Sequence, residues 1–436
     1  MNTELLIYVL ILLLFAYFMC DRDIFSPGVI VSGMFLISIY IAMYVDSSIN
    51  MKLSSETSTV LLFGIGSIVV VNIISSIFYK LTKKTVYRHL SITISPIKVR
   101  YRTFLLFFST FIFVISAVEV LRLAFSLGGV GLSGLIHAFR MNAISGDEQL
   151  PSIISNLITI NNATGFLGCY IVVNNYFVTR KIDKGLSLLI LYPSLIGLLS
   201  GARGYIIQYL VFIVTLYYFF YLVTKKKTHI DGKIVGKMLI YFAGMFAFFY
   251  LIKFVIGRTD TLGFFDYICM HLVYPLKLLD LYVGEHHALS PIWGEETFTH
   301  LIATLGKLGF LEYTTHYNDY ANFRVLNGIS LGNVYTAFRA YYSDFGMAGV
   351  IIIPGMISLI ASRLYYKFRT QKVTKIKLVN WPLFFYAYLV YGLIMMSYSN
   401  QILEYTCDFG FLKKIIIWVA FDYIFLRGKI SFKTRR

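Results

Sequence analysis

Charged residues are scarce in this 436-residue chain. Asp, Glu, Lys and Arg together make up 14% of it, whereas about 25% is usual in soluble domains. Apolar residues make up 58%, and so few polar groups could not cover the surface of a soluble enzyme of this length. The same composition excludes an intrinsically disordered chain. The sequence therefore predicts a protein that has lipid around most of its surface.

Cysteine and proline are also rare, with 4 and 8 residues. The cysteines lie far apart and form neither a CxxC motif nor a His/Cys metal-binding pattern, which excludes a disulfide scaffold and a zinc site. We interpret them as packing residues and expect no metal and no other cofactor. A P-loop and a Rossmann glycine pattern are missing as well, so ATP-driven chemistry has no visible site.

Long apolar stretches are abundant instead, and they predict an all-α polytopic membrane protein. We expect about eleven transmembrane helices, near residues 5–20, 28–45, 58–79, 103–125, 153–177, 186–200, 205–223, 238–256, 346–366, 383–398 and 411–426. The sixth is short, so we expect it to be tilted, broken or surrounded by protein. A twelfth span near 264–283 is the alternative. Its four charged or ionisable residues favour an interfacial or re-entrant helix there.

The basic residues predict the orientation of these spans. The net charge is +17, and 26 of the 39 Lys and Arg residues fall on one side if the eleven spans alternate. These residues are Arg22 and those within 80–102, 180–184, 225–237, 367–377 and 427–436. Cytoplasmic loops carry such an excess, so nucleic acid is not needed to explain the charge. The N-terminus is predicted outside and the C-terminus inside.

This topology divides the chain into three parts. Residues 1–256 form helices 1–8 with short loops. Residues 257–345 form one large extracytoplasmic loop domain with amphipathic helices, and this loop contains five of the eight His residues. Residues 346–436 form helices 9–11 and a basic cytoplasmic tail. A long loop rich in aromatic residues is more typical of a functional segment than of a disordered one.

Two arginines on the predicted outer face suggest a phosphate site. Arg203 lies in the turn SGARG (200–204) between the sixth and seventh spans. A guanidinium beside helix N-terminal amides suits phosphate or pyrophosphate, and the alternative is an anchor that reaches the lipid headgroups. Arg140 lies in the other outer loop, near 126–152, together with Glu148.

A second cluster leads into the ninth span, in GNVYTAFRAYYSDFG (332–346). If this segment is helical, Tyr335, Arg339 and Tyr342 share one face, and Asp344 follows. Aromatic rings beside an arginine suit sugars and sugar phosphates. A membrane-interface belt with a structural Arg–Asp pair is the alternative.

Upstream, GEETF (294–298) places Glu295 and Glu296 shortly before His300. Glutamate and histidine are common general bases for an alcohol when their pKa values are perturbed. The alternative is a solvated acidic loop without a chemical role.

Four stretches together resemble the bacterial oligosaccharide repeat-unit polymerases, the O-antigen polymerase (Wzy) family. They are DIFSP (23–27), SGARG (200–204), GEETF (294–298) and NVYTAFRAYYSDFG (333–346). The last is the most specific, and SGARG is also similar to a pattern in O-antigen ligases. The order of spans and loops resembles that of the family over most of the chain, whereas the amino-acid sequence resembles it only in these four stretches.

The resemblance implies a membrane-embedded glycosyltransferase of lipopolysaccharide biosynthesis in the bacterial inner membrane. It would transfer a growing glycan from undecaprenyl pyrophosphate to the terminal sugar of a new lipid-linked unit, at a site that faces the periplasm. Expected partners are these lipid-linked oligosaccharides, the bilayer, a chain-length regulator and a flippase. A flippase of lipid-linked glycan, or an O-antigen ligase, remains the alternative function.

The same resemblance implies roles for the candidate residues. One group would bind the pyrophosphate or shape the substrate site: Arg203, Arg258, Arg324, Arg339, Arg140, Tyr335 and Tyr342. A second group would supply the base that deprotonates the acceptor hydroxyl: Glu295, Glu296, His300 and Asp344. The sequence leaves the choice among these bases open.

Overall fold

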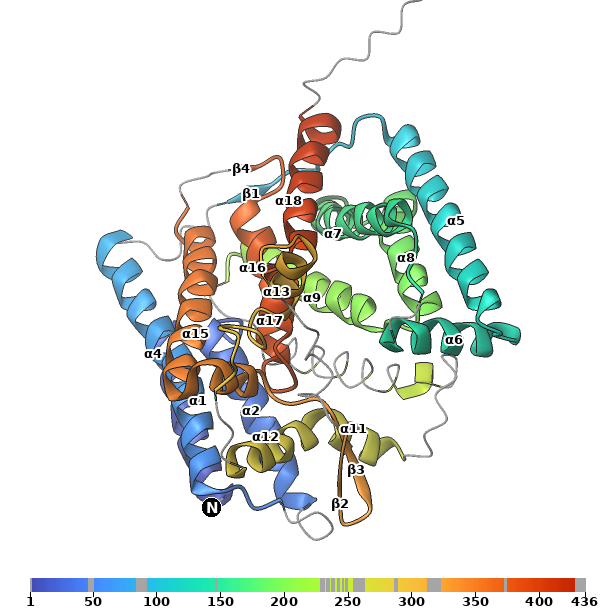
Figure 1. Ribbon diagram of the computed structural model, residues 1–436. Coiled ribbons are helices and arrows are strands. Elements are labelled where there is room, and N and C mark those ends of the chain that lie inside the picture. Colours follow the sequence, from blue (N-terminus) through green and yellow to red (C-terminus); the bar gives the residue numbers. More distant parts are fainter. Residues whose placement is uncertain are drawn as a thin grey trace, which may run out of the picture. The chain divides into compact units, whose positions relative to one another are not determined.

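The computed structural model describes residues 2–45, 51–83, 92–145, 148–227, 263–285, 289–311, 323–371 and 375–427, with residues 232, 236, 240, 244, 247 and 250–253. Helices account for most of this part of the chain (Figure 1). The chain forms two compact units. Unit 1 contains residues 1–88, 262–371 and 388–411, and unit 2 contains residues 89–261, 372–387 and 412–436.

Among the described residues, seven helices are long and apolar enough to cross a membrane. They are α1 (Asn2–Met19), α2 (Pro27–Tyr44), α4 (Ser55–Lys83), α5 (Arg102–Ser126), α7 (Ser152–Thr179), α9 (Gly204–Lys225) and α15 (Ala337–Arg369). Two shorter apolar helices are α8 (Lys184–Leu199) and α16 (Trp381–Met395). This confirms an all-α membrane protein, whereas the count of eleven spans stays a prediction.

The segment with two predicted alternatives forms two short helices, α11 (Phe264–Leu272) and α12 (Tyr274–Gly284). The break at Val273 and Pro275 divides it because proline cannot donate the backbone hydrogen bond that a continuous helix needs. At about 1.5 Å per residue, neither helix could cross a hydrocarbon core about 30 Å thick. Most of the predicted span 238–256 lies outside the described residues.

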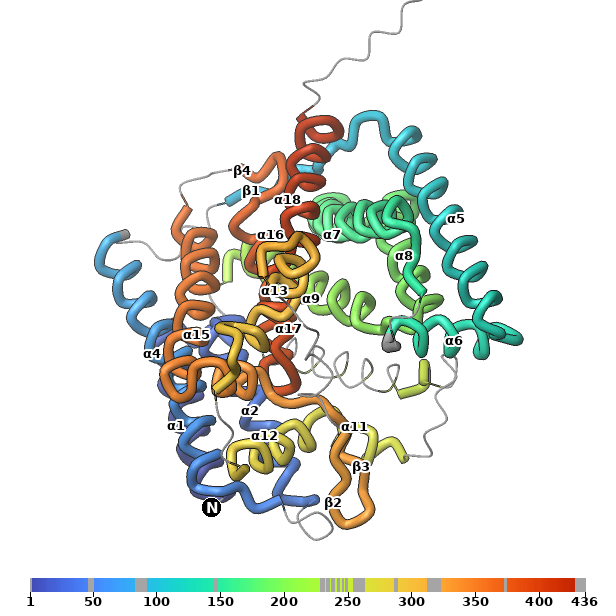
Figure 2. Tube along the Cα trace, viewed as in Figure 1, coloured from blue at the N-terminus to red at the C-terminus, as the bar shows by residue number. Residues whose placement is uncertain are grey.

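Unit 1 is built around α4 and α15, which pack against each other although they are far apart in the sequence. Figure 2 shows α4, in light blue, beside α15, in orange. Asn72 of α4 holds the contact, because its amide donates to Ser362 Oγ over 2.9 Å and its oxygen accepts from Ser26 Oγ over 2.6 Å. Such side-chain hydrogen bonds stabilise helix packing in lipid, where the hydrophobic effect between helices is small.

The DIFSP turn between α1 and α2 is fixed by the C-terminal end of α15. Asp23 accepts a hydrogen bond from Arg369 over 3.0 Å and another from the Tyr365 hydroxyl over 2.5 Å. The side chains of Asp23 and Arg369 are fully buried. A charge sequestered in this way requires a partner, so this motif has a structural role in unit 1.

α15 contains a break at Gly346, which has φ 59° and ψ −149°. This backbone conformation is essentially limited to glycine. The first part, residues 337–345, therefore takes its own direction, and the second part, residues 347–369, forms the long apolar helix. The ninth span was predicted to begin at this position.

Unit 2 is centred on α7, which packs against α5, α8 and α9. α8 contains Pro193, in agreement with the expectation of an irregular short span. Trp418 of α18 (Phe409–Phe421) donates to the Ala163 carbonyl of α7 over 2.8 Å. A short parallel pair, β1 (Thr93–Ile94) with β4 (Lys375–Ile376), completes the unit together with α6 (Gly131–Ser145) and the π-helical turn Asp422–Leu426.

Candidate functional site

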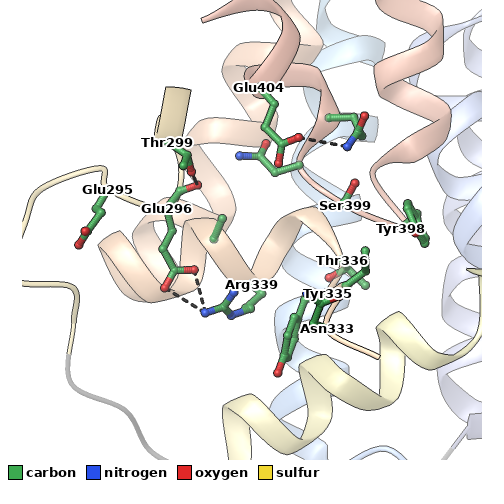
Figure 3. A pocket seen from close by; sticks show the side chains of 14 residues that line it. Glu295, Glu296, Thr299, Asn333, Tyr335, Thr336, Arg339, Tyr398, Ser399 and Glu404 are labelled. Atoms are coloured by element: carbon green, nitrogen blue, oxygen red, sulfur yellow. Dashed lines mark hydrogen bonds and ion pairs between the residues drawn. The ribbon is translucent and has the colours of Figure 1, made fainter. Parts of the chain in front are cut away.

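Unit 1 contains a cavity of about 330 Å³, a size within the range of small-molecule sites. Three segments form its walls: the GEETF loop, the N-terminal part of α15, and the turn that leads into α17 (Gln401–Thr406) (Figure 3). The lining residues are Glu295, Glu296, Thr299, Asn333, Val334, Tyr335, Thr336, Arg339, Ala340, Tyr398, Ser399, Asn400, Gln401 and Glu404. Most of these are polar, and all belong to unit 1.

Backbone hydrogen bonds hold the GEETF loop in place. Asp344 accepts from the Thr297 amide over 2.6 Å and from the Glu296 amide over 3.3 Å. On the other side, Asn400 donates to the Thr297 carbonyl over 2.9 Å. Asp344, a predicted base, is thus an acceptor for the loop backbone and does not line the cavity. Asp344 therefore fixes the backbone of the loop at Glu296.

Glu296 and Arg339 form an ion pair at the cavity wall. Arg339 Nη2 lies 3.0 Å from Glu296 Oε2 and 3.1 Å from Oε1, and Ser343 Oγ donates to Oε1 over 2.8 Å. Both side chains are about nine-tenths buried. Glu296 therefore has fixed partners in the protein, and it is one of the residues that line the cavity.

The protonation of Glu296 is poised near neutral pH. Burial raises the pKa of Glu296 to about 7; Arg339 opposes this shift, and the carboxylates of Asp344 and Glu295 add to it. An acid with a pKa near the working pH can both accept and release a proton, which is what a general base needs. The combination of cavity and perturbed pKa marks Glu296 as the candidate for chemistry.

Aromatic rings fix the position of Arg339. Its guanidinium carbon lies 4.5 Å from the centre of the Tyr335 ring and 4.8 Å from that of Tyr282, within the range of cation–π contacts. Arg324 of β2 (Arg324–Leu326) donates to the Tyr335 hydroxyl over 2.9 Å and pairs with Glu285. Arg324 thus lies behind Tyr335, outside the lining, and acts on the site through that ring.

The opposite wall carries another carboxylate, Glu404 of α17, which is half-buried. Gln401 Nε2 donates to Glu404 Oε2 over 3.1 Å. Burial raises the pKa of Glu404, and His300 opposes the shift. Nδ1 of His300 donates to the Glu404 carbonyl oxygen over 3.1 Å, because that oxygen can only accept. His300 is exposed and does not line the cavity.

The remaining predicted residues of this region have different environments. Glu295 lines the cavity but is 2% exposed and accepts from Ser290 Oγ over 3.0 Å; Figure 3 shows its side chain directed away from Arg339. Tyr335 precedes α15, so it contacts Arg339 without sharing a helical face with it. Tyr342 is half-buried and lies outside the lining.

Arg140 and Arg203 belong to unit 2. A side chain at Gly201 would bring its Cβ within 3.0 Å of Arg140 Cβ, so the glycine lets Arg140 pack on the SGARG turn. Arg203 directly precedes α9 and is 6% exposed. The structure therefore brings Arg140 of α6 to the SGARG motif. Arg258 lies outside the described residues.

The wall that contains Asn400, Gln401 and Glu404 was missed in the sequence. The sequence did contain a clue to this wall, because these polar residues follow the apolar stretch 383–398. The distribution of basic residues predicts that this stretch ends on the outer face. Their partners lie about a hundred positions earlier, however, and only the fold brings the two segments together. Close approach is possible at Gly392, where a Cβ would lie 2.8 Å from Ile402 Cα.

In comparisons with protein-family models, curated proteins and solved structures, none matched the chain. Within the described residues, no group of three or more His, Cys, Asp or Glu side chains could hold a metal ion. Function is therefore inferred from the cavity and from its chemistry.

Proposed function

We propose that this protein is a membrane-embedded glycosyltransferase that polymerises polyprenyl-pyrophosphate-linked oligosaccharide units. The observation that carries the proposal is Glu296, a buried carboxylate with a pKa of about 7, at the wall of a polar cavity that a membrane protein maintains beside its apolar helices. The resemblance of GEETF and of 333–346 to the polymerase family supports it, because both stretches line this cavity.

In the proposed reaction, an acceptor hydroxyl of the new unit enters the cavity and gives its proton to Glu296. The hydroxyl oxygen forms a bond to the anomeric carbon of the donor glycan. The bond from that carbon to the pyrophosphate breaks, and polyprenyl pyrophosphate leaves with the bonding electrons. Arg339 orients Glu296 and stabilises its ionised form.

The departing pyrophosphate needs positive charge. Arg339 is already paired with Glu296. Within unit 2 alone, we propose Arg203 and Arg140 as an anion site. Their support is the packing of Arg140 on the SGARG turn and the position of Arg203 before the N-terminus of α9, where backbone amides and the helix dipole favour anions.

We further propose that the chain crosses the bacterial inner membrane eleven times, with the cavity on the periplasmic side. The clustering of basic residues in alternate loops supports this topology. In intact cells, cysteines introduced at Ala321 and Ser145 should react with an impermeant thiol reagent, and one at Thr228 should not. Labelling at Thr228 would contradict the topology.

The test of function combines a deletion with a reconstitution. Cells that lack the gene should make single repeat units in place of polymer. The purified protein in nanodiscs, given the lipid-linked unit, should form longer glycans and release polyprenyl pyrophosphate. Polymer that persists in the deletion strain contradicts the proposal. Loss of all outward transport of the units would indicate a flippase, and polymer that is made but not attached to lipid A core would indicate a ligase.

A further inference from the structure

The described residues that line the cavity carry no surplus of positive charge when their acids are ionised. Only four of its fourteen lining residues are charged, the carboxylates Glu295, Glu296 and Glu404 and the single guanidinium of Arg339. Its formal charge is −2 when all three acids are ionised, and it rises to zero when Glu296 and Glu404 are protonated. With both Glu296 and Glu404 ionised, an anionic ligand therefore meets a net negative site.

An added anion would also act on the existing acids. A negative charge beside Glu296 and Glu404 disfavours their ionised forms, and burial already raises the pKa of each. A carboxylate or phosphate on the ligand would therefore keep the proposed base protonated. A hydroxyl or an ammonium group has no such effect.

Three polar atoms of the lining residues lack a hydrogen-bond partner among the described residues. Arg339 Nε, Thr336 Oγ1 and Ser399 Oγ are buried and have no hydrogen-bond partner among the described residues. Thr336 and Arg339 are 2% and 8% exposed. Buried polar atoms of this kind are costly unless something bonds to them. The lining as a whole contains amide, hydroxyl and carboxylate side chains, which supply both donors and acceptors, together with Tyr335 and Tyr398, a combination suited to a sugar.

We infer that the cavity binds a sugar residue that is uncharged or carries an amine, and that it discriminates against sugars that carry a carboxylate or a phosphate. The inference rests on the proposed function, in which this sugar is the acceptor end of the new unit. Glu404 is the specificity residue, because its charge lies on the wall opposite the Glu296–Arg339 pair.

The experiment measures binding to the full-length protein in nanodiscs at about pH 7, by ligand-detected NMR. The probes are methyl glycosides, amino sugars and uronic acids of the gluco, galacto and manno series, so that each charge class presents the same stereochemistries. We expect the best uronic acid to bind at least about tenfold more weakly than the best methyl glycoside, which corresponds to about 1.4 kcal/mol. The best amino sugar should bind at least as well as the best methyl glycoside.

Three variants locate this discrimination. Glu404→Gln removes one negative charge from the cavity and should reduce the ratio between neutral and anionic sugars about threefold. Glu56→Gln makes the same change at an exposed position of α4 in the same unit and should leave the ratio unchanged. Asn333→Trp fills the half-buried rim of the cavity and should abolish binding of every probe, with unchanged thermal unfolding as the check on folding.

Uronic acids that bind as tightly as methyl glycosides would overturn the charge discrimination, as would equal ratios in wild type and Glu404→Gln. Binding that survives Asn333→Trp, or no binding by any probe, would overturn the assignment of this cavity as the sugar site. These outcomes are separate from the failure of the proposed function, which is measured by polymer formation in the deletion strain. If polymerisation requires the protein but the cavity does not distinguish neutral from anionic sugars, the proposed function stands and only the inference about the sugar's charge is overturned.

Discussion

The two ends of α15 each carry an arginine paired with a carboxylate and in contact with tyrosine, yet their surroundings differ. At the C-terminal end, Arg369 and Asp23 are fully buried, and the Tyr365 hydroxyl shares the same carboxylate oxygen. At the N-terminal end, Arg339 and Glu296 line a cavity. The chemical groups are nearly the same, so residue type alone does not separate a structural pair from a functional one.

The two pairs differ in their surroundings: the Asp23–Arg369 pair is enclosed by protein, and the Glu296–Arg339 pair lies at a cavity. In the sealed pair, both side chains are fully buried and are bonded only to protein groups, among them each other and the Tyr365 hydroxyl, so the pair fixes the turn between α1 and α2. In the open pair, both residues belong to the lining of a cavity that a ligand could enter. The first pair should therefore respond to mutation through stability and the second through activity.

The largest expected effect is on stability, at the sealed end. Arg369→Ala leaves the Asp23 carboxylate buried without its cation, and breaking a buried pair in this way costs about 3–5 kcal/mol. Thermal unfolding of the detergent-purified protein measures this loss. Arg363→Ala is the matched control, because Arg363 is an exposed residue of the same helix and its removal should change stability little. Similar unfolding of both variants would contradict a structural role for the Asp23 pair.

At the open end, the main effect should be on catalysis. Glu296→Gln keeps the size of the side chain but cannot accept the proton, and loss of a general base typically costs about a hundredfold or more in rate. Polymer formed per amount of folded protein in nanodiscs is the measurement. Glu56→Gln is the control for a lost charge. Activity of Glu296→Gln within about threefold of wild type would remove Glu296 as the base.

The break between the two ends can be tested at Gly346. An alanine there would hold a backbone conformation that costs non-glycine residues about 1–3 kcal/mol, and the strain should also displace residues 337–345 from the cavity wall. Gly355→Ala serves as the control, because its new Cβ would meet Val71 Cγ2 at 3.6 Å, an ordinary contact. Unfolding temperature and polymerisation are both measured. An unchanged Gly346→Ala protein would show that the break is not required.

The smallest expected effect is the pH dependence of the open pair. The pKa of Glu296 is raised to about 7, so the ionised, active base becomes more populated as pH increases through that value. The polymerisation rate should rise about tenfold between about pH 6 and pH 8 and then level off. The residual activity of Glu296→Gln should not show this increase in rate with pH. A wild-type rate that falls over the same interval would contradict a carboxylate base.

The sequence predicted the features that depend on local composition. The seven long helices agree with seven of the expected apolar stretches, because hydropathy over about twenty residues is a strong signal in lipid. The start of the ninth span at Gly346 was also recognisable. Glu296, Arg339 and Tyr335 were singled out from their motifs, and the structure places all three at one cavity.

Other features depend on contacts that no local pattern encodes. Asp344 and Arg324 were predicted as a base and a phosphate ligand, but their partners are the Thr297 amide and Glu285, respectively. A charged residue beside a motif looks the same in sequence whether it contacts the ligand or supports a neighbour. Glu404 was missed for the opposite reason, since it belongs to no motif and reaches the site only through the packing of α17.

The Asn72 hydrogen bond between α4 and α15 sets an order of events during biogenesis. Ser362 follows Asn72 by 290 residues, and at about 5–20 residues per second the ribosome needs about 15–60 s to synthesise that interval. Throughout this time, α4 resides in the bilayer with one amide donor that has not met its native acceptor. The N-terminal helices must therefore wait, sheltered by an insertase or by one another, until the last third of the polypeptide has been translated. A nascent chain that stalls before α15 would keep this amide without its native acceptor, and an unsatisfied polar group in lipid is costly.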